Sequence, residues 1–210
     1  MNSDKQRKIH VLLLSIVTIV FIWSIIKPKS YLDWLAEVSP AVVIIIIMIA
    51  TYKKFRFTTL SYIIIALLAI LTFIGGHYTY SEVPLFNWIK DEFDLQRNNY
   101  DRLGHFLKGL GAIVVREILL SFTPLKKGAW LSSITISIML AIAALYEIIE
   151  WLSTKVSKGG QGSKDFLGMQ GDIWDAQWDM FLELVGSILT IIIFTKLHDK
   201  LLRKKSDQTK

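Results

Sequence analysis

Long, uninterrupted apolar runs constrain this chain more than any other feature of its sequence. Six runs reach the length of about 20 residues that an α-helix needs to cross the hydrocarbon core of a bilayer. We predict one membrane span in each of them, at residues 9–26, 35–52, 58–80, 104–122, 129–151 and 177–197. Because a spanning helix satisfies its own backbone polar groups, the sequence indicates an all-α, polytopic membrane protein with six transmembrane helices in a lipid bilayer.

The distribution of basic residues predicts the orientation of these spans. If the N-terminus lies in the cytoplasm, the cytoplasmic segments carry fourteen Lys and Arg residues and the opposite segments carry eight. Cytoplasmic segments normally hold the excess, so we expect both the N-terminus and the C-terminus to be cytoplasmic. Most of the excess charge that gives the net value of +6 flanks membrane spans, as this topology requires, so we expect no nucleic-acid partner.

The two longest connections then lie on the outer side of the membrane. Residues 81–103 mix aromatic and aliphatic side chains with charged ones, a pattern typical of a short helix that lies in the membrane interface. Residues 152–176 contain a Gly-rich stretch from Lys158 to Lys164, which is either a lid over a site or a simple loop.

Charged residues divide the chain into unequal parts. The first two spans carry one such residue, Glu37 near the rim of the second, whereas the last three spans and their edges carry many. A charged side chain at the bilayer centre costs about 2.5–3.5 kcal/mol on insertion scales, so several together need a reason. We interpret residues 1–57 as scaffold helices, residues 58–197 as the helices that carry a polar site, and residues 198–210 as a basic cytoplasmic tail.

Helical spacing predicts that many of these polar groups meet near the outer surface. Residues three or four positions apart share a helix face, as Asp101 and His105 do. Asp175 and Asp179 share a face in the same way if the sixth helix begins before residue 177. We therefore expect an outward-facing pocket formed by two imidazoles and six carboxylates: His77, Asp101, His105, Glu147, Glu150, Asp172, Asp175 and Asp179.

Deeper in the membrane, the same spacing suggests an ion pair beneath the pocket. Arg116 lies eleven residues beyond His105 and about 16 Å deeper, and Glu183 lies about as far below Asp172. We expect Arg116 and Glu183 to pair. The two remaining histidines, at positions 10 and 198, are expected to be ordinary residues of the cytoplasmic rim.

Imidazoles and carboxylates without sulfur form a ligand set suited to Zn²⁺, Mn²⁺ or Mg²⁺. The chain has no Cys, which excludes disulfides and thiolate ligands. The expected metal ligands are His77, His105, Asp101, Glu147, Asp172 and Asp175. The candidate catalytic groups are Asp101, His105, Glu147, Glu150, Asp172, Asp175 and Asp179. The candidate substrate-binding residues, for an anionic lipid or cell-envelope molecule, are Lys108, Arg116, Trp174 and Gln177.

Several functions stay open on this pattern. A divalent metal would support hydrolysis or group transfer, or the site would bind a ligand without chemistry. Acids and histidines along a membrane path also suit a proton or cation transporter or conductor. A sensor or partner subunit is a third class, and the acids could also serve only to lock helices together. The sequence contains no HExxH, GxSxG or P-loop pattern, and it does not identify a protein partner.

Four motifs resemble the YjdF-like family of bacterial inner-membrane proteins over residues 76–190. They are NYDRLGHF at 99–106, RE at 116–117, YEIIEW at 146–151 and GMQGDIWDAQWDM at 168–180. The resemblance implies a multi-pass protein of the bacterial plasma (inner) membrane, and it brings no established reaction. The order of these motifs also resembles, more distantly, that of VanZ-type membrane proteins, although the third motif ends in Glu-Trp where that pattern has Gln.

Overall fold

Helices make up all of the regular secondary structure in residues 3–156 and 169–207, the part of the chain that the computed structural model describes. In chain order they are α1 (Ser3–Ile25), α2 (Tyr31–Thr51), α3 (Thr59–Tyr78), η1 (Tyr80–Glu82), α4 (Pro84–Glu92), α5 (Tyr100–Lys108), η2 (Gly109–Gly111), α6 (Ala112–Phe122), α7 (Ala129–Val156) and α9 (Asp175–Asp207). The predicted all-α fold is confirmed.

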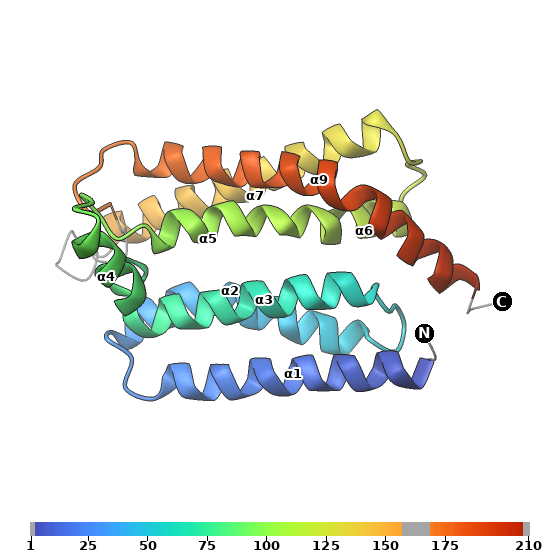
Figure 1. The fold of residues 1–210 in the computed structure, drawn as a ribbon, viewed down its shortest axis with the longest axis horizontal. Helices are drawn as coiled ribbons and strands as arrows, with labels where there is room; N and C mark the ends of the chain where they lie inside the picture. The colour runs from blue at the N-terminus through green and yellow to red at the C-terminus, as the bar shows by residue number, and fades with distance from the viewer. Residues whose placement is uncertain (1–2, 157–168, 208–210) are drawn as a thin grey trace.

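The long helices lie in two layers, with their axes along one direction (Figure 1). One layer contains α1, α2 and α3, and the other contains α5, α6, α7 and α9. Helix α3 packs against α1 and α2 and also contacts α5, so it joins the layers. Both termini lie at the end of the bundle opposite α4 (Figure 1), as an even number of passes requires. We call these two ends the α4 end and the terminal end.

Five helices are long and apolar enough to cross a membrane, namely Asp4–Ile25, Tyr31–Thr51, Thr59–Tyr78, Ala129–Leu152 and Asp175–Asp207. The sixth predicted span, residues 104–122, is divided into α5, the 3₁₀ turn η2 and α6, each too short to qualify alone. These pieces follow one another along the bundle (Figure 1). The polytopic membrane fold is confirmed, whereas the sixth span and the cytoplasmic side of the termini stay predictions.

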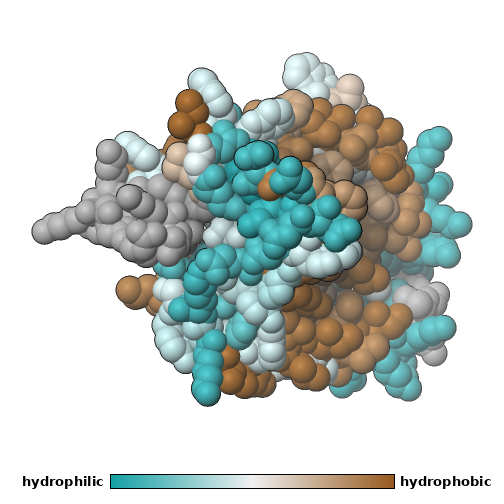
Figure 2. All heavy atoms as spheres, turned by 60° about the vertical axis from the view of Figure 1, so that its left-hand side comes forward, coloured by the Kyte–Doolittle hydropathy of each residue, from teal (hydrophilic) through white to brown (hydrophobic). Residues whose placement is uncertain are grey.

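The surface matches this arrangement. Figure 2 shows hydrophilic residues gathered over the α4 end and hydrophobic residues along the flank of the bundle. At that end, the connection 81–103 contains the expected short amphipathic helix, α4. Leu85 and Trp88 are exposed on it, as a helix in a membrane interface requires.

The C-terminal tail begins as helix. Helix α9 continues to Asp207, beyond the predicted span boundary at residue 197. His198 is fully buried, at 0% exposed, so this part of the chain packs onto the bundle as helix. Figure 1 shows the end of α9 crossing the terminal end toward the first layer.

Two glycines let α9 and the segment before α6 touch through their backbones. A Cβ atom on Gly186 would lie 2.1 Å from the carbonyl oxygen of Phe106. One on Gly109 would lie 2.5 Å from the backbone nitrogen of Ser187. Small residues permit such close packing of helices in membranes, where helices associate through dispersion and polar contacts rather than through the hydrophobic effect. The contact places α5 directly beside the polar face of α9.

We predict that Gly186→Ala destabilises the protein, because its added methyl group overlaps backbone that cannot move aside. Overpacking of this kind costs about 1–3 kcal/mol. For a chain of this size that corresponds to a thermal midpoint lower by roughly 2–4 °C per kcal/mol. The matched control is Gly104→Ala, whose new Cβ would lie 3.7 Å from Tyr80, an ordinary contact. Equal midpoints for the two variants, measured on purified protein in detergent, would contradict the tight crossing.

Candidate functional site

His105 lies at the centre of a buried group of charged side chains. It is 1% exposed, and its Nε2 atom is 3.6 Å from Glu147 Oε1 and 3.7 Å from Asp101 Oδ1. Its Nδ1 atom is 3.4 Å from Glu183 Oε2, on the other side of the ring. We name this group the acid–histidine cluster, with members from α5, α7 and α9: Asp101, His105, Lys108, Glu147, Glu150, Asp179 and Glu183.

Helix α9 supplies its acids from a single face. Asp175, Asp179 and Glu183 are four residues apart, and all three are buried. Gln177 lies two residues from both Asp175 and Asp179, which places it on the opposite side of the helix, and it is exposed. Trp174 precedes the helix and is 58% exposed. The structure therefore brings the predicted acidic stripe together and leaves Trp174 and Gln177 outside the cluster.

Several polar atoms inside the cluster lack a hydrogen-bond partner. They are His105 Nδ1, Glu147 Oε1 and Asp179 Oδ1, all shielded from solvent. A buried polar atom without a partner costs about 1–3 kcal/mol, and more when its group is charged. Such atoms in one place make the cluster a candidate site.

Three side chains of the cluster have the spacing of metal ligands. Asp101, His105 and Asp179 each offer one ligand atom, and these atoms lie within 4.8 Å of one another. Oxygen and imidazole nitrogen ligands suit zinc and manganese, and the carboxylates alone suit magnesium. Asp101 and His105 were among the expected ligands, whereas Asp179 was expected only as a catalytic group.

Lys108 is a cation inside the cluster. Its Nζ atom lies 3.0 Å from His105 Nε2 and 4.2 Å from the centre of the Tyr146 ring. Its charge acts on every carboxyl of the cluster: Asp101, Glu147, Glu150, Asp179 and Glu183. Arg97 and Arg102 add further positive charge near Asp101.

The first layer contributes one acid that the sequence interpretation assigned to the scaffold. Glu37 of α2 is 4% exposed, and its Oε2 atom has no hydrogen-bond partner. Asp101 and Lys108 both act on it electrostatically. The signal was present in the sequence, since Glu37 interrupts an apolar run, but its neighbours depend on how α2 packs against α3.

Toward the α4 end, two arginines cover the cluster. Arg97 pairs with Asp175, and Arg102 pairs with Asp172. The backbone N–H of Trp174 donates to Asp172 Oδ1 at 2.9 Å. This N–H and the Arg102 guanidinium hold the pKa of Asp172 below its usual range. Asp172 and Asp175 are therefore paired with arginines, a difference from the expected metal-ligand set.

Two hydrogen bonds between Gln170 and Asn98 fix the segment before α9 to the segment before α5. The backbone N–H of Asn98 donates to Gln170 Oε1 at 2.8 Å, and Gln170 Nε2 donates to the carbonyl oxygen of Asn98 at 2.9 Å. The Gly-rich stretch from Lys158 to Lys164 lies outside the described residues, so the choice between lid and loop stays open.

The expectation that His77 joins the pocket is wrong. Its Nδ1 atom lies 3.1 Å from the carbonyl oxygen of Ser24, and its ring stacks 4.3 Å from that of Trp23. His77 ends α3 at the correct depth but faces α1. Depth along a helix can be counted from the sequence, whereas the direction of a side chain depends on which helices are neighbours.

The predicted Arg116–Glu183 pair is also wrong. Arg116 lies 2.8 Å from Asp199 Oδ1 and 2.9 Å from His198 Nδ1, while Glu183 faces His105. The predicted pair assumed that Asp172 and His105 lie at the same depth in the membrane. Because Asp172 precedes α9 and pairs with Arg102, Glu183 comes level with His105, and Arg116 lies a further three turns away.

Arg116 belongs to a second polar group, which we name the Glu117 cluster: Thr58, Ser61, Arg116, Glu117, His198, Asp199 and Lys205. Glu117 is fully buried and accepts hydrogen bonds from the Thr58 backbone N–H at 2.8 Å and the Ser61 hydroxyl at 2.6 Å. His198 Nε2 lies 3.4 Å from Glu117 Oε2. The sequence interpretation missed this cluster, although adjacent charges at 116 and 117 in an apolar run signalled it.

Neither terminal-end histidine is an ordinary rim residue. His198 is buried in the Glu117 cluster. His10 is also buried, with Nδ1 2.9 Å from the Tyr52 hydroxyl and Nε2 3.1 Å from Thr59 Oγ1. Both rings connect helices from distant parts of the chain, and nothing in their local sequence shows that.

These features define a class, that of all-helical, multi-pass membrane proteins with a buried acid–histidine cluster between α5, α7 and α9. The chain matches the family described as "Predicted membrane protein (DUF2238)" over residues 9–200, and it belongs to that family. It is 39% identical over 189 residues to the inner membrane protein YjdF of Escherichia coli (strain K12), an alignment that covers 90% of each chain.

These matches confirm the resemblance to YjdF-like proteins and the bacterial inner membrane as the location. They do not bear on the resemblance to VanZ-type proteins, which stays a prediction. No solved structure matches the chain.

We predict that Glu117→Gln strongly destabilises the protein. A carboxamide would turn an NH₂ group toward the hydroxyl and N–H donors of Thr58 and Ser61, and would leave His198 and Lys205 without their anion. Breaking a buried charge pair costs about 3–5 kcal/mol. Thermal unfolding in detergent should show the loss.

The matched control is Glu82→Gln, which removes a half-exposed partner of Lys29. Exposed pairs contribute about 0–1 kcal/mol, so this variant should unfold near the wild-type temperature. A smaller loss for Glu117→Gln than for Glu82→Gln would show that the Glu117 cluster does not hold the terminal end together.

Proposed function

We propose that the acid–histidine cluster binds a divalent cation, and that the protein uses this cation to act on a lipid or cell-envelope molecule at the α4 end. The observation that carries the proposal is the set of ligand atoms from Asp101, His105 and Asp179 within 4.8 Å of one another. The reaction class would be hydrolysis or group transfer, or binding of the molecule without turnover.

Two properties of the cluster support a cation. The first is its charge, since five carboxylates lie close enough to act on one another and a dication would reduce their repulsion. The second is Asp179 Oδ1, which is buried and has no hydrogen-bond partner, as a ligand atom does when the protein is considered alone.

Burial of the ligand residues fits an ion better than a substrate. His105 is 1% exposed and Asp179 is 3% exposed. A lipid or envelope molecule would have to approach the cluster from the α4 end, past the pairs Arg97–Asp175 and Arg102–Asp172.

The roles of the residues follow from their positions. Asp101, His105 and Asp179 would hold the cation, which would polarise a carbonyl or phosphoryl oxygen and lower the pKa of a nearby water. Glu147, 3.6 Å from His105, is placed to accept a proton. Arg102, at the partly exposed edge, is placed to meet an anionic group. Lys108 lies inside the cluster and would balance its charge.

We predict that purified wild-type protein retains a divalent ion in elemental analysis, and that His105→Ala and Asp179→Asn do not. Loss of a supporting residue alone costs about 10–100-fold in metal affinity, so loss of a ligand should cost at least that much. Thermal midpoints and elution profiles of the same samples will show whether each variant is folded.

The control is Asp172→Asn, which removes an acid that pairs with Arg102 and lies outside the ligand set. It should retain the ion. A wild-type protein without a bound ion, or an equal loss in Asp172→Asn and Asp179→Asn, would count against the proposed site.

The second candidate is a proton or cation conductor, and one observation favours it. Helix α9 carries buried polar side chains from one end of the bundle to the other, through Ser187 and Thr190 between the two clusters. Ser187 Oγ has no hydrogen-bond partner. Ala112, Met139 and Ile191 pack together in the same stretch and would narrow such a path.

For this candidate, we predict ion flux into liposomes driven by a pH or cation gradient and abolished by Glu147→Gln. The amide cannot exchange a proton or carry charge, which stops transfer at the acid–histidine cluster. Glu92→Gln, at the exposed end of α4, should leave the flux unchanged. Wild-type liposomes no more permeable than empty ones would remove the conductor from consideration.

A further inference from the structure

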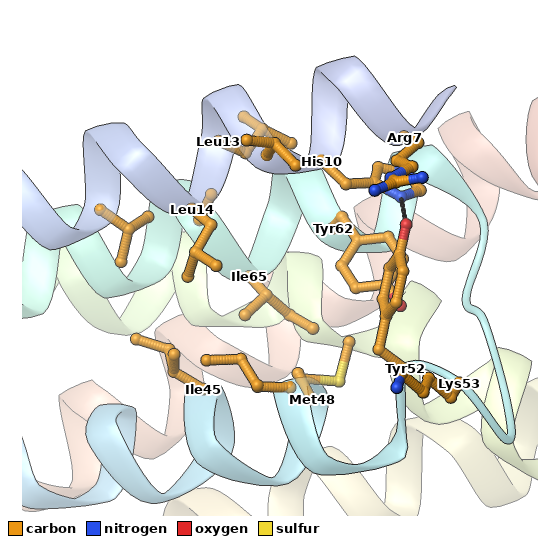
Figure 3. Close-up of a pocket in the computed structure, with 14 residues that line it drawn as sticks. Arg7, His10, Leu13, Leu14, Ile45, Met48, Tyr52, Lys53, Tyr62 and Ile65 are labelled. Atoms are coloured by element: carbon orange, nitrogen blue, oxygen red, sulfur yellow. Dashed lines mark hydrogen bonds between the residues drawn. The ribbon is translucent and has the colours of Figure 1, made fainter. Parts of the chain in front are cut away.

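A second feature of the molecule lies far from the acid–histidine cluster, in the first layer at the terminal end. There α1, α2 and α3 enclose a cavity of about 290 Å³ (Figure 3). This volume is near the lower limit of small-ligand sites, roughly 300–1,000 Å³. Its body is aliphatic, with Leu13, Leu14, Ile45, Met48 and Ile65 among the lining side chains.

One end of the cavity is cationic. Figure 3 shows Arg7, Tyr52 and Lys53 together at this end, and the aliphatic side chains extending away from them. Arg7 and Lys53 are exposed, and the Arg56 guanidinium lies 4.9 Å from the centre of the Tyr52 ring. None of the described residues that line the cavity is acidic. An anionic group would therefore be attracted here.

Hydrogen-bonding groups accompany the charged residues at this end. The Tyr52 hydroxyl lies 2.9 Å from His10 Nδ1, the hydrogen bond drawn beside Arg7 in Figure 3. The cavity thus has a cationic and polar end and an apolar body. A glycerophospholipid has the matching order of a phosphate and ester region followed by an acyl chain.

The cavity opens sideways between α1 and α2. Val11 and Leu14 of α1 and Ile49 of α2 line it and are also exposed. Both helices pack against α3, which forms the back wall. At the depth of a membrane span this opening meets lipid chains rather than water, so an acyl chain can enter from the bilayer.

We propose that this cavity is a binding site for an anionic phospholipid, with one acyl chain between α1 and α2 and the phosphate against Arg7 and Lys53. The site does not depend on the cation proposed for the acid–histidine cluster. It also gives a function to the first layer, which would hold a lipid of the leaflet at the terminal end. A basic pocket between spanning helices is a recognised mode of binding anionic head groups.

The test uses purified full-length protein and two defined lipids, phosphatidylglycerol and phosphatidylcholine, with bound lipid counted by native mass spectrometry. We expect wild-type protein to retain phosphatidylglycerol in preference to phosphatidylcholine. In Arg7→Gln/Lys53→Gln, phosphatidylglycerol should bind roughly fivefold more weakly per charge removed, the factor equivalent to about 1 kcal/mol. The binding of phosphatidylcholine should not change.

Two further variants locate the effect. Lys126→Gln/Lys204→Gln removes two exposed charges at the same end of the molecule but outside the cavity, and should keep the wild-type preference. Ile49→Trp places a large side chain at the opening, where the wild-type residue is 54% exposed, and should reduce binding of both lipids without loss of folding.

Three results would overturn the proposal. Equal retention of the two lipids by the wild type would indicate an unselective apolar cavity. An equal loss in the Lys126/Lys204 control would indicate a general effect of charge. Unchanged binding in folded Ile49→Trp would place the lipid elsewhere on the protein.

Discussion

Carboxylates at the depth of a membrane span must find partners within the protein, and this requirement organises the second layer. Backbone contact at Gly109 and Gly186 lets α5 and α9 lie close enough for His105 to sit among acids from three helices. A side chain at either glycine would overlap backbone of the other segment and disturb the contacts of His105 with those acids. The small residues and the acids therefore depend on one another.

The sequence predicts best those features that repeat along a single helix. The pairing of Asp101 with His105 follows from a spacing of four, and the buried face of α9 follows from the same spacing at Asp175, Asp179 and Glu183. Apolar run length likewise predicts the long helices, because a bilayer fixes how many residues a span needs. In each case the physical cause acts within one element and can be counted.

Features that join different elements were not predictable in this way. His77 and His198 were placed at reasonable depths, yet one faces Ser24 and the other faces Glu117. The predicted partner of Arg116 was wrong because the depth of Glu183 was counted from Asp172 as if both lay in one helix. Asp172 lies before α9, so Glu183 lies at a different depth than that count gives. The 3₁₀ turn in residues 104–122 was equally hidden, since Gly109 and Gly111 interrupt a run whose composition suits one helix.

The stretch between the two clusters bears on how the molecule works. Ala112, Met139 and Ile191 pack together there, and Ser187 and Thr190 are buried polar side chains of α9 over the same stretch. An ion held by Asp101, His105 and Asp179 would lie closer to the α4 end, near Arg102, which is partly exposed. The Glu117 cluster, by contrast, ties the end of α9 to α3 and α6. This asymmetry favours a site served from one side of the membrane over a path across it.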